Sequence, residues 1–194
     1  VMVGYACNET PEYLPMPVVA AQRLVTLLEI SRMTGVIPDI GPDGKVQVTM
    51  EYDGDTPVRI TTVVVSVQHK EDVDIDKLAD LLDEYVFPLA FDGMPADDAE
   101  IILNPSGKFV QGGPDADTGL TGRKLMVDSY GTFAPHGGGA FSGKDATKVD
   151  RSGAYMARYI AKNMVAAHLA NRCQVTLAYA IREKDPVMVD VNTF

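Results

Sequence analysis

Residues 46–52 read Val46-Gln-Val-Thr-Met-Glu-Tyr52, in which every second side chain is apolar or aromatic. An alternation with a period of two is typical of a β-strand that buries one face. Asp53-Gly54-Asp55 follows and predicts a tight turn, and the β-branched residues of 58–68 predict a returning strand. This stretch therefore predicts an antiparallel hairpin with one face toward a hydrophobic core.

Helices are predicted on both sides of this hairpin. Apolar residues recur at three- and four-residue steps over 18–33, and Gly35 ends that pattern. Residues 38–44 are predicted as a loop. After the hairpin, Asp74 can cap a helix over 75–87 that Pro88 ends. Short strands are predicted at 1–6, 100–103 and 125–127.

The hairpin motif returns near the C-terminus. Gln174-Val-Thr-Leu-Ala-Tyr179 matches Gln47-Val-Thr-Met-Glu-Tyr52 at four of six positions. The second copy also follows a predicted helix, at 150–170, and begins a predicted hairpin, with strands at 173–181 and 187–191 around a turn at 182–186. Six residues can coincide by chance, but the shared helix–strand–strand order favours a duplication.

The predicted fold class is therefore α+β, with repeated units of helices packed on antiparallel or mixed β-sheets. We expect a first unit at 1–113. The second unit, at 114–194, combines a glycine-rich segment with a C-terminally incomplete copy. Because the chain opens on Val1 as a strand and stops in a strand-like run, we expect it to be a piece of a longer polypeptide.

The stretch from Asn104 to Lys162 has unusual charge and glycine content. It holds eight Lys and Arg residues against five Asp residues, in a chain whose formal net charge is −10. Glycine-rich backbone with lysines nearby suits the oxygens of a small polyanion. Residues 138–144 have P-loop spacing, but Asp145 stands where a P-loop needs a Ser or Thr hydroxyl, so we reject that motif. A tight surface turn with solvated lysines remains the alternative.

Several single residues have two interpretations. Asp150 can be a metal ligand or a helix N-cap. Asp117 can form a turn or receive an amine from a ligand. Phe109 can be a core residue or a platform for a base. His69 and His168 are interpreted as structural, and no Cys or His spacing supports zinc.

Composition limits the classes of binding partner and indicates a cellular location. The acidic balance argues against nucleic acid or an anionic membrane as a partner. No apolar run approaches a membrane span, and no secretory signal is visible. The two cysteines, Cys7 and Cys173, form no disulfide framework, so a cytoplasmic location is the expectation.

The motifs resemble those of the S-adenosylmethionine synthetase (methionine adenosyltransferase) family, in its central and C-terminal portion. The resemblance rests on Gly112-Gly-Pro-x-x-Asp117-x-Gly-Leu-Thr-Gly-Arg123-Lys124 and on His136-Gly-Gly-Gly-Ala140-Phe-Ser-Gly-Lys144-Asp-x-x-Lys148-Val-Asp150-Arg-Ser152. Gly4-Tyr-Ala-x-Asn8-Glu-Thr10 and Pro42-Asp-x-Lys45-x-Gln-Val-Thr49 support it. The family's N-terminal His-Pro-Asp motif, its mobile loop and its C-terminal tail are missing here.

The resemblance implies roles for individual residues. It implies catalytic roles for Lys45, Arg123, Lys124 and Lys144. The implied ATP-binding residues are Asp43, Lys45, Lys108, Phe109, Asp117, Arg123, Lys124, Ala140 and Lys144. Asp117 and Lys148 correspond to positions near methionine, and Asp150 corresponds to a magnesium-linked carboxylate. Lys108 stands where arginine is common in the family.

The implied activity is the synthesis of S-adenosylmethionine from ATP and L-methionine. The triphosphate formed is then hydrolysed to phosphate and diphosphate. The family implies a pseudo-three-fold architecture, of which two partial units are seen, and two Mg²⁺ per site with K⁺. It also implies a homodimer with shared active sites, often doubled to a homotetramer. These residues alone are expected to be inactive, and the alternative is a non-catalytic nucleotide- or polyanion-binding module of the same fold.

Overall fold

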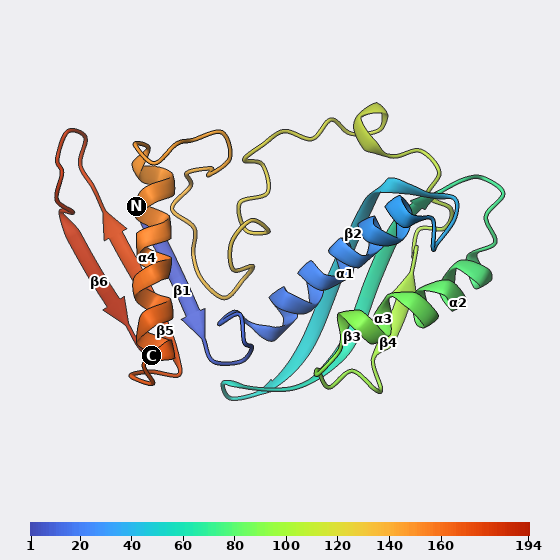
Figure 1. Ribbon diagram of the computed structural model, residues 1–194, viewed down its shortest axis with the longest axis horizontal. Helices are drawn as coiled ribbons and strands as arrows, with labels where there is room; N and C mark the ends of the chain where they lie inside the picture. Colours follow the sequence, from blue (N-terminus) through green and yellow to red (C-terminus); the bar gives the residue numbers. More distant parts are fainter. The chain divides into compact units, whose positions relative to one another are not determined.

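The computed structural model describes residues 1–194, which form two compact units (Figure 1). Met16–Gly119 make up one of them, here called the central unit. Val1–Pro15 and Leu120–Phe194 make up the other, here called the terminal unit. The predicted boundary between 113 and 114 stays a prediction, but the first fifteen residues cluster with the C-terminal part. The reason is that the first strand pairs with a strand near the C-terminus.

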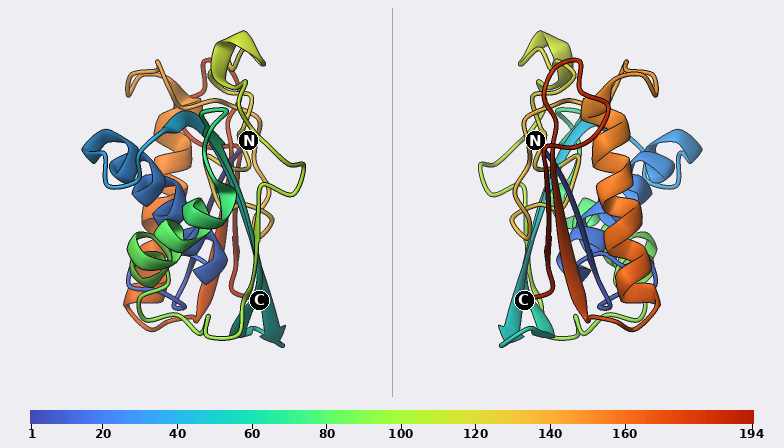
Figure 2. Two further views of the ribbon diagram at one scale, coloured as in Figure 1. Left: turned by 90° about the vertical axis from the view of Figure 1, so that its right-hand side faces the viewer. Right: turned by 90° about the vertical axis from the view of Figure 1, so that its left-hand side faces the viewer.

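The central unit is a three-stranded mixed sheet covered on one face by helices (Figure 2). The strands are β2 (Ile40–Asp53), β3 (Thr56–His69) and β4 (Glu100–Leu103), in the order β2-β3-β4. β2 and β3 are antiparallel, and β4 runs parallel to β3. The remaining elements are α1 (Met16–Thr34), α2 (Ile75–Tyr85), α3 (Phe87–Ala90) and the 3₁₀ turn η1 (Gly113–Asp115).

The predicted hairpin of the central unit is confirmed. Asp53 pairs with Thr56 around a turn in which Gly54 has a φ of 58°, a value that favours glycine. Val46, Val48 and Met50 pack against the core, as their alternation predicted. That core joins α1, the sheet and α2 through buried Leu24, Leu28, Ile60, Val63, Val65, Leu78 and Leu82.

Two boundaries in the central unit differ from the predictions. The loop predicted at 38–44 is wrong from Ile40 onward, because β2 begins there and pairs with the end of β3 through an irregular register. Asp74 does cap α2, accepting hydrogen bonds from the amides of Asp76 (3.0 Å) and Lys77 (3.5 Å). However, α2 stops at Tyr85, and Pro88 lies in the first turn of α3, where its missing N–H is tolerated.

The terminal unit is an antiparallel sheet with one long helix on it (Figure 2). Its strands are β1 (Met2–Cys7), β5 (Arg172–Ala178) and β6 (Met188–Asn192), in the order β1-β5-β6. α4 (Val149–Ala166) covers one face and buries Ala154, Ala157 and Ala161. These short side chains let the helix approach Gly4 of β1 so closely that any side chain there would overlap its backbone.

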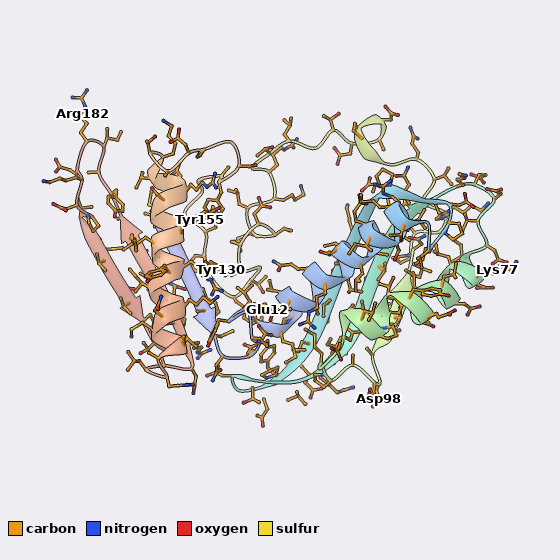
Figure 3. The ribbon with its side chains drawn as sticks, in the orientation of Figure 1. Glu12, Lys77, Asp98, Tyr130, Tyr155 and Arg182 are labelled. Carbon is orange, nitrogen blue, oxygen red and sulfur yellow. The ribbon has the colours of Figure 1, made fainter.

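The other face of this sheet is covered by the segment that follows residue 120. Tyr5 of β1 packs edge-on against Tyr130, which Figure 3 labels, with ring centroids 5.9 Å apart. Val3, Cys7 and Ala134 complete this second, smaller core. Burial raises the pKa of the Cys7 thiol from 9.0 to about 12.

Three predictions for the terminal unit are corrected. The strand predicted at 125–127 is a turn, in which Asp128 N donates to Lys124 O (2.9 Å), and Met126 and Val127 are exposed. The helix predicted over 150–170 ends at Ala166, and His168 adopts a positive φ of 57°. Asp150 is not the N-cap, because Lys148 occupies that position.

Candidate functional site

The residues singled out by sequence are divided between the two units. Asp43, Lys45, Lys108, Phe109 and Asp117 belong to the central unit. The terminal unit contains Arg123, Lys124, Ala140, Lys144, Lys148 and Asp150.

In the central unit, Asp43 and Phe109 meet around a glycine. Asp43 Oδ2 accepts a hydrogen bond from Gly113 N (2.8 Å). A Cβ at Gly112 would lie 3.0 Å from the Phe109 ring and 3.1 Å from Asp43 Cβ, so only glycine fits without displacing them. The Asp43 carboxylate therefore fastens β2 to the start of the glycine-rich segment.

The other three predicted residues of the central unit lie on its surface. Lys108 is exposed and donates to Glu71 O (2.7 Å) and Glu71 Oε1 (3.0 Å). Lys45 is exposed on β2, opposite Ser66. Asp117 is exposed in the turn after η1, where its amide donates to Gly113 O (3.0 Å).

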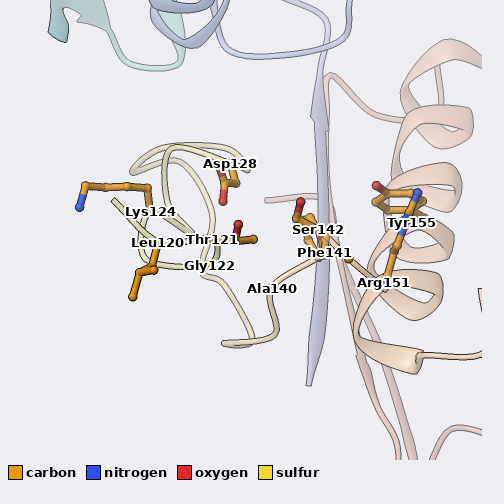
Figure 4. A pocket seen from close by; sticks show the side chains of 11 residues that line it. Leu120, Thr121, Gly122, Lys124, Asp128, Ala140, Phe141, Ser142, Arg151 and Tyr155 are labelled. Atoms are coloured by element: carbon orange, nitrogen blue, oxygen red, sulfur yellow. The ribbon is translucent and has the colours of Figure 1, made fainter. Parts of the chain in front are cut away.

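The terminal unit contains an open cavity of about 540 Å³, shown in Figure 4. The loop around Gly122 forms one side of the cavity. Residues 140–143 and the start of α4 form the other side. Lys124 and Ala140 are the predicted residues that line it. The other predicted residues of this unit do not: Arg123, Lys144, Lys148 and Asp150. The full lining is Leu120, Thr121, Gly122, Lys124, Asp128, Ala140, Phe141, Ser142, Gly143, Arg151 and Tyr155.

The first turn of α4 holds Lys144 from two directions. Lys144 Nζ donates to Asp150 Oδ2 (2.8 Å), with side chains 30% and 44% exposed. Arg151 Nη1 donates to the Lys144 carbonyl, and its guanidinium lies 5.3 Å from the centre of the Tyr155 ring. Lys144 and Asp150, the predicted phosphate and metal residues, thus satisfy each other in this chain.

Local contacts hold the loop on both sides of Lys144, at residues 136–147. Gly138 N donates to His136 Nδ1 (2.8 Å), while His136 Nε2 is buried without a hydrogen-bond partner. Gly139 must lack a side chain, because a Cβ there would lie 2.5 Å from Asp150 Cγ. Asp145 accepts from the hydroxyl and amide of Thr147, which lowers the pKa of its carboxyl. α4 begins only at Val149, so the P-loop geometry is absent, as predicted.

The motifs did not predict that Phe141, Arg151 and Tyr155 line the cavity. Arg151 and Tyr155 are four residues apart on α4, a spacing that places side chains on the same helix face. That spacing was an available signal, but nothing local indicated that this face meets the glycine loop. Gln68 and His69 were also missed as neighbours of Phe109.

Comparison with known proteins identifies two domains, whose bounds differ from those of the two compact units. The sequence model described as "S-adenosylmethionine synthetase, central domain" matches residues 1–109, and the one described as "S-adenosylmethionine synthetase, C-terminal domain" matches residues 111–194. The chain belongs to the S-adenosylmethionine synthetase family. It is 54% identical over 195 residues to an S-adenosylmethionine synthase of Desulforudis audaxviator (strain MP104C). That match covers 100% of this chain and 49% of the relative, so the chain spans about half of the relative's length.

Membership of the S-adenosylmethionine synthetase family confirms the resemblance drawn from the glycine-rich motifs and the α+β architecture. The family suggests metal cofactors in general. In this chain, however, no three His, Cys, Asp or Glu side chains come together to hold a metal ion, and Asp150 already accepts from Lys144. These residues by themselves do not fit a metal site.

None of the helices combines the length and apolar composition that a transmembrane span requires.

Proposed function

We propose that this chain serves the synthesis of S-adenosylmethionine from ATP and L-methionine. The methionine sulfur would attack C5′ of the ribose, the bond from C5′ to the triphosphate oxygen would break, and the triphosphate would then be hydrolysed to phosphate and diphosphate. The observation that carries the proposal is the match of both synthetase domains, which together account for nearly every residue.

The proposed roles follow the charge that develops on the leaving triphosphate. Lys45, Arg123, Lys124 and Lys144 would stabilise it, because fixed cations at a developing anion lower the barrier. The chain offers no protein nucleophile at a recognisable spacing, and this direct displacement needs none. Lys124 and Ala140 line a cavity of about 540 Å³, a size within the usual range of small-molecule sites.

The remaining residues would bind the two substrates. Phe109 would stack on adenine, and its partial exposure leaves ring surface for such a contact. Asp117 and Lys148, both exposed, would face methionine. Asp43 would act on ATP indirectly, since its carboxylate already accepts from Gly113 N. Lys108 would complete the nucleotide-binding side of the central unit.

We also propose the family's cations, assembly and location. Two Mg²⁺ and K⁺ would assist, with Asp150 supplying one carboxylate and the other ligands coming from outside these residues. When bound, magnesium would share the charge of the triphosphate. The assembly would be a homodimer with shared active sites, doubled to a homotetramer, in the cytoplasm.

The alternative is a non-catalytic nucleotide- or polyanion-binding module. It is favoured by the incomplete metal site, because no three potential ligands come together. It is also favoured by the Lys144–Asp150 ion pair, because the predicted phosphate-binding lysine and the predicted metal ligand already bind each other. The discriminating experiment uses a completed synthase, defined as this chain joined to the part of the Desulforudis audaxviator synthase that it does not match. Methionine-dependent formation of S-adenosylmethionine by the completed synthase, and none by the 194 residues alone, is the expected result. ATP binding without turnover in the completed synthase would favour the alternative.

A further inference from the structure

Two successive residues at the end of β3, Gln68 and His69, hold the segment that carries Phe109. Neighbouring side chains of a strand point to opposite faces of the sheet. The two side chains therefore reach the segment after residue 108 from different sides. Both contacts lie within the central unit and join residues about forty positions apart in the chain.

His69 holds the main chain of Phe109 at two points. His69 N donates to Phe109 O (2.9 Å), and Phe109 N donates to His69 Nε2 (3.1 Å). His69 is 2% exposed, so its ring is shielded from solvent. The peptide groups on both sides of the Phe109 Cα are thereby tied to the end of β3.

The third contact of His69 selects its tautomer. His69 Nδ1 lies 2.8 Å from Lys70 O, which can only accept a hydrogen bond. Nδ1 must therefore carry the proton, while Nε2 must be unprotonated to accept from Phe109 N. One neutral tautomer satisfies both contacts, and the ring has no nitrogen left for a ligand.

Gln68 makes the matching contacts on the other side. Its Nε2 donates to Val110 O (3.1 Å), and its Oε1 accepts from Asp43 N (3.3 Å). The residue after Phe109 is thus joined to β2 through one amide side chain. A Cβ at Gly112 would come within 2.9 Å of Gln68 Cδ, so the segment passes directly over this amide.

We propose that His69 is a positioning residue for the Phe109 ring in nucleotide binding, with Gln68 as its counterpart on the opposite face. This inference rests on the proposed function, in which Phe109 stacks on adenine. A phenylalanine side chain has only two torsions, so a fixed backbone leaves its ring only a few rotamers to adopt. Holding that backbone before the nucleotide arrives reduces the ordering cost of binding.

The kinetic test compares two substitutions in the completed synthase. In His69→Gln, the side-chain oxygen stands near the place of Nε2 and can still accept from Phe109 N. In His69→Asn, the shorter amide can still donate to Lys70 O but does not reach Phe109 N. We expect His69→Asn to raise KM for ATP about threefold to tenfold, the effect of one lost hydrogen bond, and His69→Gln to restore most of it. KM for methionine and kcat should change less than about twofold, as for lost uniform binding of one substrate.

Phe109→Ala in the same protein separates this inference from the function it rests on. If Phe109→Ala leaves KM for ATP unchanged, the adenine-stacking role itself is wrong. If Phe109→Ala raises KM for ATP but His69→Asn does not, the positioning role is overturned while the proposed function stands. Equal effects of His69→Asn and His69→Gln would also overturn it, because packing alone would then explain both.

A measurement without substitution covers the case in which the variants do not fold. The chain has only three histidines, so ¹⁵N resonances of its imidazoles can be assigned. In the 194-residue chain we expect the Nδ1-protonated tautomer of His69 and a scalar coupling between Phe109 N and His69 Nε2 across the hydrogen bond. The Nε2-protonated tautomer would overturn the inference.

Discussion

Replacing Gly4 by alanine should separate β1 from α4. An added Cβ would lie 2.1 Å from Ala157 C and from Arg158 N, both backbone atoms of the helix. Ordinary contact begins near 3.4 Å, so strand and helix would have to part by about 1.3 Å. Rotating a side chain cannot relieve this overlap, because none of the three nearest atoms belongs to one.

The energetic cost follows from what the separation exposes. Met2, Ala6, Ala154, Ala157 and Ala161 form much of the buried core between sheet and helix, and all depend on the close approach. Overpacking a close-packed site typically costs 1–3 kcal/mol. Since the contacted atoms here belong to the backbone, we expect Gly4→Ala to lower the free energy of unfolding of the terminal unit by about 3 kcal/mol.

Gly153→Ala is the matched control, because it adds the same methyl group to the same interface. There the new Cβ would lie 3.1 Å from Met2 Cγ, part of a flexible side chain that can move. Alanine also gains up to about 1 kcal/mol over glycine within a helix. We therefore expect a change smaller than about 1 kcal/mol in either direction.

Hydrogen exchange of amides in α4 and β5 measures the terminal unit by itself, and urea unfolding supplies the overall value. Gly4→Ala should accelerate exchange throughout both elements, whereas Gly153→Ala should not. If Gly4→Ala exchanges like the wild type, the close approach of β1 and α4 does not exist in solution.

Three further predictions concern single side chains. Burial raises the pKa of the Cys7 thiol from 9.0 to about 12, so the unfolded chain loses this proton at lower pH than the folded chain does. The free energy of unfolding should therefore fall as pH rises from about 9 toward 12. Urea titrations should show a shallower fall for Cys7→Ala than for the wild type. Asp74→Ala should destabilise the central unit by about 1 kcal/mol through loss of the α2 cap, measured by thermal unfolding against exposed Asp80→Ala, and equal effects would contradict the cap. Asp150→Asn should free Lys144 and raise affinity for inorganic tripolyphosphate, in the presence of a chelator, by about 1.5- to 5-fold. Calorimetry with Asp145→Asn as the control tests this, and an equal gain in both variants would show that general charge, not the ion pair, is responsible.

The elements of this fold that depend on near neighbours were predicted well. The β2–β3 hairpin and the α2 cap followed from alternation, a turn glycine and one aspartate within a few residues. The strand predicted at 125–127 failed, because three apolar residues do not form a strand where no partner strand is available. Met126 and Val127 point to solvent there, and the main chain bonds within its own turn.

The candidate site was named from its motifs but not arranged by them. Lys144, Asp150 and Asp43 were all singled out, yet their sequence does not reveal that Asp150 holds Lys144 or that Asp43 holds Gly113. Packing decides whether a charged side chain is unpaired or already bonded to another residue. A sequence motif gives only the residue types. His69 was interpreted as structural, and its hydrogen bond with Phe109 N shows which part of the chain it holds.

Periodicity, caps and turn residues were enough to predict an α+β chain, because backbone geometry imposes those patterns over a few residues. The family was expected from the resemblance of the glycine-rich motifs, and the domain matches then showed it. The pairing of β1 with β5, which joins Met2 to Leu177, was not contained in either segment. Nor was the contact of His69 with Phe109, forty positions away. Such contacts form only when the whole unit closes around its core, because bringing distant segments together costs entropy that local sequence patterns do not repay. The tertiary structure therefore decided which of the predicted residues meet.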